Sequence, residues 1–478
     1  MDFRGNDRAG LRSSTEDRSQ ASSCVATLVG GDKTTALCSV ASPSIHCLRI
    51  IETGLASKNK GSEAYLIYCR MGMNSKRVIV AMSGGVDSSV AAAILKEEGY
   101  QVIGVTMQIW PPDRQKRELD PFGGCCGVSA VEDAKRVAYK LNIPHYVLNF
   151  RDIFFQKVIT PFCQDYSLGR TPNPCIKCNQ YIKFGALLRK GRELGASSIA
   201  TGHYARVEKD QVTGRYALRR GFDRRKDQSY FLYPLTQDQL KRVLFPVGDH
   251  SKEGVREIAG ELGLSVAAKP ESQEICFIPH NDYPRFLREH TPPTAVRGPI
   301  VDRQGDVLGE HQGIPFYTIG QRKRLGISSS EPLYVIAINP EENSIVVGSK
   351  GETYGDELIA SHLNWISINK LEHSIEASVK IRYLHEEAEA TITPLNEDKV
   401  NIRFKELQMA ITPGQAAVFY EGDTVIGGGT IERAGGEHHC RNNCSAQPMA
   451  KRTQHAEACG DLIPACTGAD FHKHLQKG

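Results

Sequence analysis

The sequence has no apolar run of about 18 residues or more, so we expect no helix that spans a membrane. An apolar h-region near the start, as in a secretory signal peptide, is missing as well. The chain also lacks the G-x-x-x-x-G-K-[ST] pattern, in which a lysine reaches the terminal phosphates of a nucleotide. These absences argue against a membrane protein, a secreted protein and a nucleotide-binding protein of the Walker A kind.

Cysteine is sparse in the part of the chain that has regular patterns. Of the 14 cysteines, four lie in residues 1–70 and four in residues 434–478, which leaves six for the long stretch between. That density suits a reduced intracellular enzyme better than a disulfide scaffold, so we expect a cytoplasmic protein with no membrane partner. The six are Cys125, Cys126, Cys163, Cys175, Cys178 and Cys276.

Both ends of the chain lack periodic hydrophobic patterns. Residues 1–72 are rich in Ser, Gly and charge, which predicts a disordered extension. A mitochondrial or plastid transit peptide is one alternative, although seven acidic residues in 1–70 argue against it. A miscalled start site, with Met71 or Met73 as the true start, is the other. Residues 434–478 are predicted to be a disordered tail, with a zinc knuckle as the alternative. The candidate zinc ligands are His438, His439, Cys440, Cys444, His455, Cys459 and Cys466.

At 478 residues the chain is too long for one simple core, and we expect several domains. Over residues 73–278, buried-strand patterns alternate with helical patterns, which predicts an α/β fold with a doubly wound, Rossmann-like parallel sheet. One predicted helix begins at Tyr181, after a Pro-Asn-Pro turn, and another opens with a capping box of Thr236 and Gln239. Short β-type runs divided by Gly, Asn and Asp then predict small barrel-like domains at 279–357 and 358–433. The net charge of +4 permits a nucleic-acid partner without demanding one.

The stretch "SGGVDSS", Ser83 to Ser89, lies between the first predicted strand and the first predicted helix. Two glycines let the backbone approach a ligand, and the N-terminus of a helix attracts phosphate through its unpaired amides and dipole. Because the serine hydroxyls add donors, the loop predicts a nucleotide site. A Gly-rich turn with Asp87 as a helix cap is the plainer alternative.

Met107 and the pair Gly202–His203 fall at the C-terminal ends of predicted parallel strands. Open α/β sheets place ligands at those ends, so these residues are candidates for the same site. A lone histidine such as His203 is more often packed in a core, but its place beside a glycine at a strand end favours a site.

"SGGVDSS" resembles the PP-loop of the N-type ATP pyrophosphatases, which adenylate a carbonyl and release pyrophosphate. The loop alone does not distinguish members such as GMP synthetase, tRNA lysidine synthetase and the tRNA thiolation enzymes. Seven further motifs follow in order: "GRTPNPCIKCNQYIKF", "ATGHYA", "RKDQSYFL", "EICFI", "TIGQRKRLGI", "KIRY" and "ITPGQAAVFY". With them the chain resembles the MnmA family of tRNA-specific 2-thiouridylases from about Ser75 to Arg433.

The resemblance implies that ATP binds with Mg²⁺ and that the partners are tRNA and a persulfide donor, either a cysteine desulfurase or a sulfur-relay protein. It implies ATP contacts at Ala81, Met82, Ser83, Gly84, Gly85, Val86, Asp87, Ser88, Ser89, Met107 and Gly202. It implies tRNA contacts at Asn173, Pro174, Cys175, His203, Lys226, Asp227, Gln228, Arg382, Tyr383 and Gln415, and an RNA-binding role for the domain at 358–433.

The resemblance also assigns the catalytic thiols. Cys276 would carry the persulfide and Cys178 would be its nucleophilic partner, with a transient disulfide between them. Cys175 stands where many relatives have an aspartate, so its role is open between redox cycling and metal ligation. An iron–sulfur cluster on these three cysteines is the alternative route, but persulfide chemistry needs only two thiols. We expect Cys163, in an apolar helical pattern, to be a buried structural thiol.

The chemistry of uridine 2-thiolation agrees with a PP-loop and two thiols in one protein. The C2 oxygen leaves poorly until AMP is attached to it, and a thiolate can release the outer sulfur of a persulfide by attacking the inner one. Another adenylating RNA-modifying ligase, acting with an amine or ammonia, and a non-catalytic RNA-binding protein remain as alternatives. One departure from the family pattern is Arg324 in "GQRKRLGI", where glycine is usual and a positive φ is easier for glycine.

Overall fold

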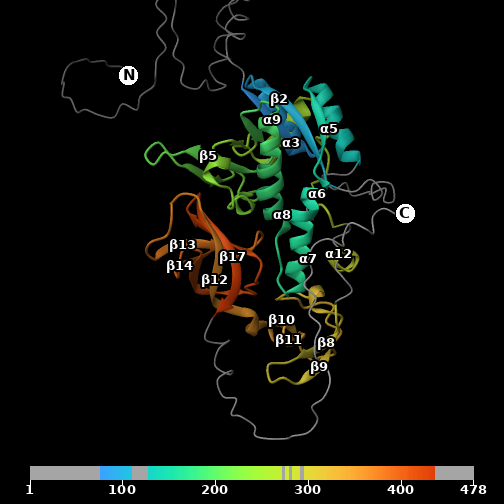
Figure 1. Ribbon diagram of the computed structural model, residues 1–478, viewed down its shortest axis with the longest axis vertical. Coiled ribbons are helices and arrows are strands. Elements are labelled where there is room, and N and C mark those ends of the chain that lie inside the picture. The colour runs from blue at the N-terminus through green and yellow to red at the C-terminus, as the bar shows by residue number, and fades with distance from the viewer. Residues whose placement is uncertain (1–75, 110–127, 272–274, 279–281, 291–294, 436–478) are drawn as a thin grey trace, which may run out of the picture. The chain divides into compact units, whose positions relative to one another are not determined.

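A computed structural model of the chain describes residues 76–109, 128–271, 275–278, 282–290 and 295–435 (Figure 1). The extension predicted at 1–72, the candidate zinc ligands of the tail, and Cys125 and Cys126 lie outside the described residues. No helix in the described ranges is both long and apolar enough to cross a membrane.

A five-stranded parallel sheet lies at the centre of the first region, in the order β3-β2-β1-β4-β7. Its strands are β1 (Arg77–Ala81), β2 (Gln101–Gln108), β3 (His145–Asn149), β4 (Ser198–Ala200) and β7 (Val243–Leu244). Ile79 packs into one hydrophobic cluster while its neighbours Val78 and Val80 pack into another, so both faces of β1 are buried. This confirms the predicted doubly wound sheet.

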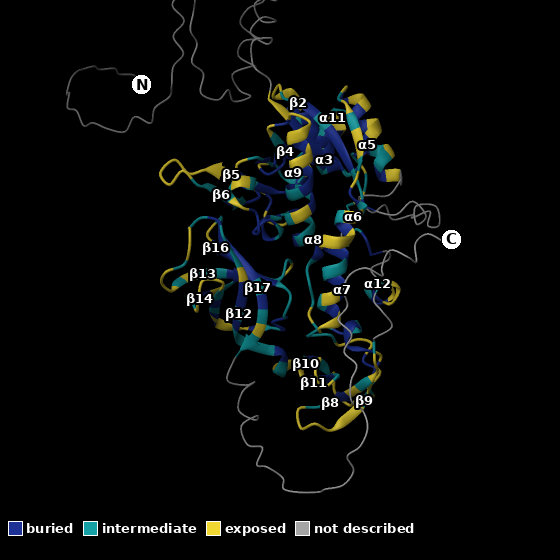
Figure 2. Ribbon diagram, in the orientation of Figure 1, coloured by how far each residue is buried: buried dark blue, intermediate teal, exposed yellow. Residues whose placement is uncertain are grey.

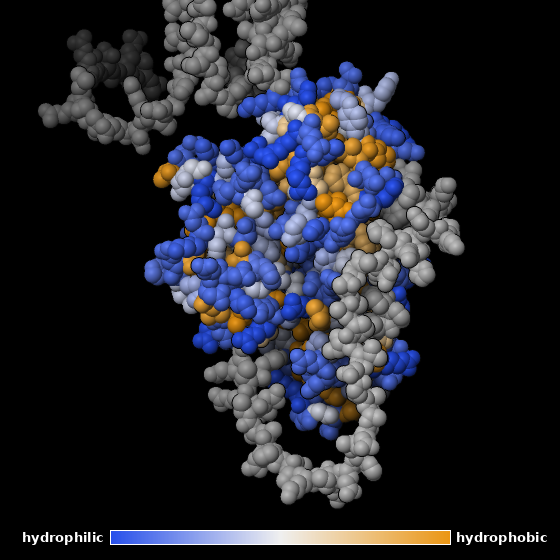
Figure 3. All heavy atoms as spheres, in the orientation of Figure 1, coloured by the Kyte–Doolittle hydropathy of each residue, from blue (hydrophilic) through white to orange (hydrophobic). Residues whose placement is uncertain are grey.

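Four helical segments follow sheet strands. They are α3 (Val86–Glu97), α5 (Val128–Lys140), the segment that ends in α9 (Leu187–Glu193), and α11 (Lys252–Glu261). Small side chains of α3, Ala91 to Ala93, are buried, which lets the helix pack closely. Figure 2 shows the burial of α3 against the sheet. At the sheet edge, β3 exposes Tyr146 and Val147, and Figure 3 shows apolar side chains gathered around α5.

Two long helical stretches of this region contain π-helical turns. The first runs through α6 (Arg151–Phe154), η1 (Phe155–Ile159) and α7 (Thr160–Ser167), and the second through α8 (Pro174–Lys177), η2 (Cys178–Ala186) and α9. The second begins before the predicted helix at Tyr181, because Asn173 caps it and Pro174 occupies its first position. Shorter helices are η3 (Ser229–Phe231) and α10 (Gln237–Leu240), which has the predicted capping box of Thr236 and Gln239.

The middle region is a small four-stranded sheet in the order β10-β11-β8-β9. Its strands are β8 (Gly298–Val301), β9 (Val307–His311), β10 (Tyr334–Asn339) and β11 (Ser344–Gly348). Helix α12 (Tyr283–His290) precedes it, and η5 (Ile314–Phe316) and η6 (Lys350–Thr353) are its short helices. Ile300, Val335, Ile345 and Val347 form its own fully buried core.

The last region is a closed antiparallel barrel. Strands β12 (Tyr354–Trp365), β15 (Lys399–Met409), β14 (Ala388–Pro394), β13 (Ile375–Lys380), β16 (Ala416–Glu421) and β17 (Thr424–Gly435) are neighbours in that order. Pairing of β12 with β17 closes the ring, which confirms the predicted barrel. A hairpin of β5 (Ala205–Lys209) and β6 (Tyr216–Arg220), which the sequence patterns did not reveal, extends this sheet through Thr424 and Arg219.

Candidate active site

The loop Ser83–Ser89 leaves β1 at the point where the order of the sheet reverses, since β2 lies on one side of β1 and β4 on the other. Such switch points bind ligands in open α/β sheets. The loop is held by its own hydroxyls: Ser89 Oγ donates to Gly85 O at 2.8 Å, and Ser88 Oγ accepts from Ser83 N at 3.2 Å. Gly84 has φ +70°, and a Cβ there would lie 2.2 Å from Ala130 O, so the position requires glycine.

Gly202 lies directly against this loop. It follows β4, and a Cβ built on it would come within 2.6 Å of Asp87 C and Ser88 N, in the first turn of α3. Met107 lies near the end of β2, the neighbour of β1 on the other side, and is half-buried. The structure therefore places Gly202 against the loop, and it places Met107 at the C-terminal end of the neighbouring strand, on the same side of the sheet as the loop.

Asp87 is held by two residues that the sequence analysis missed. Lys252 Nζ lies 2.6 Å from Asp87 Oδ1, and Tyr204 Oη donates to the same oxygen at 2.7 Å. The Lys252 side chain is only 6% exposed, so this ion pair is largely shielded from solvent. Burial raises the pKa of the Tyr204 hydroxyl, and the negative charge of Asp87 raises it further, so Tyr204 stays a donor.

The ion pairs continue from Lys252 to Glu271 at 3.1 Å and from Glu271 to Lys226 at 2.8 Å. Burial would raise the pKa of the Glu271 carboxyl, but hydrogen bonds from Lys226 and Lys252 outweigh it and the pKa is lowered. This chain of charges links the nucleotide loop to a predicted tRNA contact, Lys226. One feature of the sequence could have indicated these ion pairs. Lys252 is the first residue of a helix, where the helix dipole disfavours a cation unless an acidic partner pairs with it.

The thiols Cys175 and Cys178 occupy a capped helix. Asn173 Oδ1 accepts from Cys175 N at 3.2 Å, and Pro174 is buried as the first helical residue. Cys178 is the first residue of the π-helix η2, a helix type that often marks functional sites. The side chain of Asn179, the next residue, donates from Nδ2 to Phe231 O at 3.2 Å and ties this helix to the segment after Gln228.

Cys276 borders the same hydrophobic cluster as Cys178, and both thiols are half-buried. The neighbouring Phe277 anchors the segment, with its ring centroid 5.6 Å from Phe154 and 5.5 Å from Phe162. Cys163, 6% exposed, lies inside that cluster, as predicted. In the described part of the chain, no three His, Cys, Asp or Glu side chains form a group that could hold a metal ion, so we derive no step through an iron–sulfur cluster.

Two of the predicted tRNA-binding segments meet at Phe231. The ring of Tyr383 lies 4.3 Å from that of Phe231, and burial raises the Tyr383 pKa to about 12. Both rings border the cluster that Cys178 and Cys276 also border. The segments around Gln228, Tyr383 and Cys178 thus converge on one part of the molecule, which no sequence pattern indicated.

Several predicted tRNA contacts already have partners inside the protein. Asp227 is 6% exposed and accepts from Gly221 N and from Ser229 N, each at 3.1 Å. Gln228 Oε1 accepts from Tyr204 N at 3.1 Å. In the barrel, Arg382 donates to Thr412 Oγ1 at 2.6 Å, and Gln415 donates to Thr171 O at 2.7 Å.

His203 is buried at the start of the hairpin β5–β6. Its Nδ1 lies 2.6 Å from Thr201 Oγ1 and its Nε2 lies 3.4 Å from Lys183 Nζ. Burial, and then the charge of Lys183, lower the pKa of this imidazole well below its usual value, so it is neutral. The ring also packs 5.9 Å from Phe184 and from Phe245, so aromatic rings flank it inside the protein.

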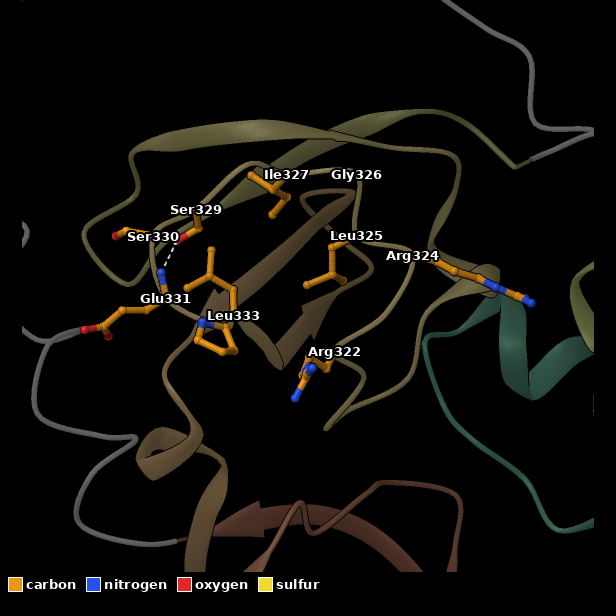
Figure 4. A pocket seen from close by; sticks show the side chains of 10 residues that line it. Arg322, Arg324, Leu325, Gly326, Ile327, Ser329, Ser330, Glu331 and Leu333 are labelled. Carbon is orange, nitrogen blue, oxygen red and sulfur yellow. Dashed lines mark hydrogen bonds between the residues drawn. The ribbon is translucent and has the colours of Figure 1, made fainter.

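A cavity of about 380 Å³ lies elsewhere, in the middle region (Figure 4). It is lined from Arg322 to Leu333 and shares no residue with the predicted sites. Arg324 adopts the left-handed conformation with φ +66°, so the turn accepts arginine in place of glycine. In Figure 4 its side chain points away from the cavity.

A PP-loop at the switch point of a parallel sheet, followed by two small β domains, defines a nucleotide-binding enzyme with appended barrels. Family models match all three regions: a tRNA methyl transferase HUP domain at 76–280, a tRNA methyl transferase PRC-barrel domain at 284–349, and an aminomethyltransferase β-barrel domain at 355–431.

The tRNA-specific 2-thiouridylase MnmA of Heliobacterium modesticaldum is 57% identical over 358 residues, 74% of this chain and 92% of the relative. The enzyme of that name from Clostridium botulinum strain Eklund 17B is 54% identical over 362 residues, 76% of this chain and 99% of the relative. The chain therefore belongs to the MnmA family of tRNA-specific 2-thiouridylases. Among solved structures, NMN synthetase from Francisella tularensis covers 43% of this chain and 69% of its own, with 18% identity and a TM-score of 0.26.

Proposed function

We propose that this enzyme replaces the C2 oxygen of the wobble uridine of tRNA by sulfur, at the expense of ATP. The main support is membership of the MnmA family, with 57% identity that extends over nearly the whole relative. The proposed mechanism has an adenylated base as its first intermediate and a cysteine persulfide as the source of sulfur.

In the first step the uracil C2 oxygen attacks the α-phosphorus of MgATP. A C–O–P linkage forms, the bond to the β-phosphate oxygen breaks, and pyrophosphate leaves. The amides and hydroxyls of Ser83–Ser89 are suited to the phosphates, and the N-terminus of α3 stabilises negative charge there. Lys252 and Tyr204 fix the orientation of Asp87 beside this loop. Mg²⁺ arrives with the nucleotide as part of the substrate, which is how it usually binds in such sites.

In the second step sulfur moves from protein to base. A partner of the persulfide-donor class, a cysteine desulfurase or a relay protein, loads Cys276 as Cys276–S–SH. The Cys178 thiolate attacks the inner sulfur, so a Cys178–Cys276 disulfide forms and hydrosulfide leaves. Hydrosulfide adds to C2 of the adenylated base, AMP departs with the former C2 oxygen, and the C=S bond forms. A cellular dithiol must then supply two electrons to reduce the disulfide.

The surroundings of the two thiols support this assignment. Cys178 and Cys276 are half-buried and border one hydrophobic cluster. The segments that hold Lys226–Gln228 and Arg382–Tyr383 reach the same cluster through Phe231, and we propose that they guide the anticodon loop. Asn173, Pro174 and Cys175 are proposed to contact the flipped uracil, and His203 to contact tRNA as in the family. For Gln415, whose side chain already donates to Thr171 O, a tRNA contact is the alternative to a positioning role. A base must leave its stack to reach such thiols.

The test uses Cys178→Ser and Cys276→Ser in the full chain. Each protein is incubated with an unmodified tRNA transcript, MgATP, cysteine and a cysteine desulfurase, and the nucleosides are analysed by mass spectrometry. We expect no detectable 2-thiouridine from either variant, while tRNA binding and one turnover of pyrophosphate release persist. Cys163→Ala, which alters a buried thiol of the same cluster, is the matched control and is expected to thiolate. Wild-type thiolation by either serine variant would contradict the mechanism.

A further inference from the structure

Tyr181 is an exposed aromatic ring one helical turn after Cys178. It lies in η2 and is 37% exposed, whereas the next residue, Ile182, is fully buried. Lys177, between the two thiols of the C-x-x-C, places its ammonium 5.7 Å from the centroid of the Tyr181 ring. Lys157, from the other π-helix η1, places its ammonium 5.8 Å from the same centroid.

The two ammonium groups share one ring, and the carboxylate of Asp165 interacts with Lys177 at electrostatic range without forming an ion pair. Neither Lys157 nor Lys177 takes part in an ion pair among the residues that the structure describes. A cation is attracted to an aromatic face at this distance, but two cations on one ring repel each other. The group Lys157–Lys177–Tyr181 therefore combines a flat apolar face with two positive charges that no ion pair neutralises among the described residues, at the surface and beside the proposed nucleophile.

A nucleotide is the ligand with matching chemistry. Proteins that bind single-stranded RNA stack its bases on exposed aromatic rings and neutralise its phosphates with lysine or arginine. An apolar protein segment would match the ring but leave both ammonium groups without partners. A free anion would match the charges but not the ring.

We propose that Lys157, Lys177 and Tyr181 form a subsite for the nucleotide adjacent to the target uridine, with its base stacked on Tyr181 and its phosphates bound by the two lysines. This rests on the proposed thiolation of tRNA, because the target uridine must be at Cys178 for its neighbour to reach Tyr181. The subsite would hold the anticodon loop open while the flipped base stays at the thiols.

The decisive variants are Tyr181→Ala and Tyr181→Phe, with Tyr139→Ala as the matched control. Tyr139 is 88% exposed on α5 and has no part in the proposed site. Binding of the unmodified tRNA transcript is measured by fluorescence anisotropy. We expect Tyr181→Ala to raise Kd about tenfold, equivalent to about 1.4 kcal/mol, and the other two variants to stay within about twofold of wild type.

The lysines are tested through the salt dependence of binding. Lys157→Ala and Lys177→Ala should each reduce the slope of log K against log salt by about 0.7, the value for one phosphate contact on a single strand. Unchanged tRNA affinity and slope in these variants, beside a wild type that binds and thiolates tRNA, would overturn the subsite and leave the proposed function intact. If only sulfur transfer from the desulfurase falls, the patch binds the donor protein and the inference is wrong. If the wild type itself neither binds nor thiolates tRNA, both proposals fail together.

Discussion

At Gly202 one added carbon would disturb the nucleotide loop. A Cβ there would lie 2.6 Å from backbone atoms of Asp87 and Ser88, far inside normal contact distance, and backbone cannot rotate away as a side chain can. We expect Gly202→Ala to displace the first turn of α3 and to lower tRNA-dependent pyrophosphate release at least about tenfold, a loss of about 1.4 kcal/mol of transition-state stabilisation.

Gly260→Ala is the control for that substitution. It lies in α11, and a Cβ there would meet no heavy atom within 4 Å. In a helix interior alanine is more stable than glycine by about 0.5–1 kcal/mol, so this variant should keep its activity and gain a little stability. Pyrophosphate release measured at varied ATP concentration separates the two. Unchanged kcat and KM in Gly202→Ala would show that Gly202 is not part of the ATP site.

At the scale of single elements, short sequence patterns predicted those features that depend only on neighbouring residues. The strand–glycine–helix pattern located the loop Ser83–Ser89, and the capping box at Thr236 appears as predicted. The start of the cysteine-bearing helix was missed because Pro174 resembles a turn residue, although proline is favoured at the first position of a helix.

Contacts between distant segments could not be predicted from patterns. Lys252 and Asp87 are far apart in sequence, and no pattern in either segment indicates that the two side chains form an ion pair. The same is true of Tyr383 and Phe231, and of the hairpin β5–β6, which adds to the barrel sheet instead of the sheet that precedes it. Periodicity reports which face of an element is buried, whereas packing of whole elements decides what it is buried against.

Asn173 caps helix α8 and is also proposed to contact the uracil, and substitutions can separate these two roles. Its side chain accepts from Cys175 N, and loss of such a cap costs about 0.5–2 kcal/mol. We expect Asn173→Ala to lower the free energy of unfolding by about 1 kcal/mol, and Asn173→Ser to restore it because serine also caps helices. Thiolation should stay reduced in both, since serine does not offer the amide proposed to contact the uracil. Full recovery of thiolation in Asn173→Ser would mean that the residue acts only as a cap. Urea denaturation and nucleoside mass spectrometry give the two readouts.

At the scale of the whole chain, the barrel is joined to the thiol-bearing segment by backbone contacts. Thr171 N donates to Pro413 O at 2.8 Å, and Gln415 Nε2 donates to Thr171 O at 2.7 Å. Gly414 has φ +92°, and a Cβ there would lie 2.9 Å from Thr171 N, so the two segments approach as closely as backbones can. Through this joint, the barrel contacts the segment that leads directly to Asn173, Cys175 and Cys178.

Substitution of Gln415 tests whether this contact between the barrel and Thr171 contributes to catalysis. Removal of its amide in Gln415→Ala leaves the half-buried Thr171 carbonyl without this donor, at a cost of about 1–3 kcal/mol. If Gln415 acts by holding Thr171, single-turnover thiolation at saturating tRNA should fall about tenfold, or about 1.4 kcal/mol in the barrier, with little change in Kd. If it contacts tRNA directly, Kd should rise and the saturated rate should not change. Gln211→Ala, at the exposed turn between β5 and β6, is the control and should alter neither quantity. Because the internal hydrogen bond is already formed without tRNA, we expect the first outcome, in which the barrel positions the proposed nucleophile, Cys178.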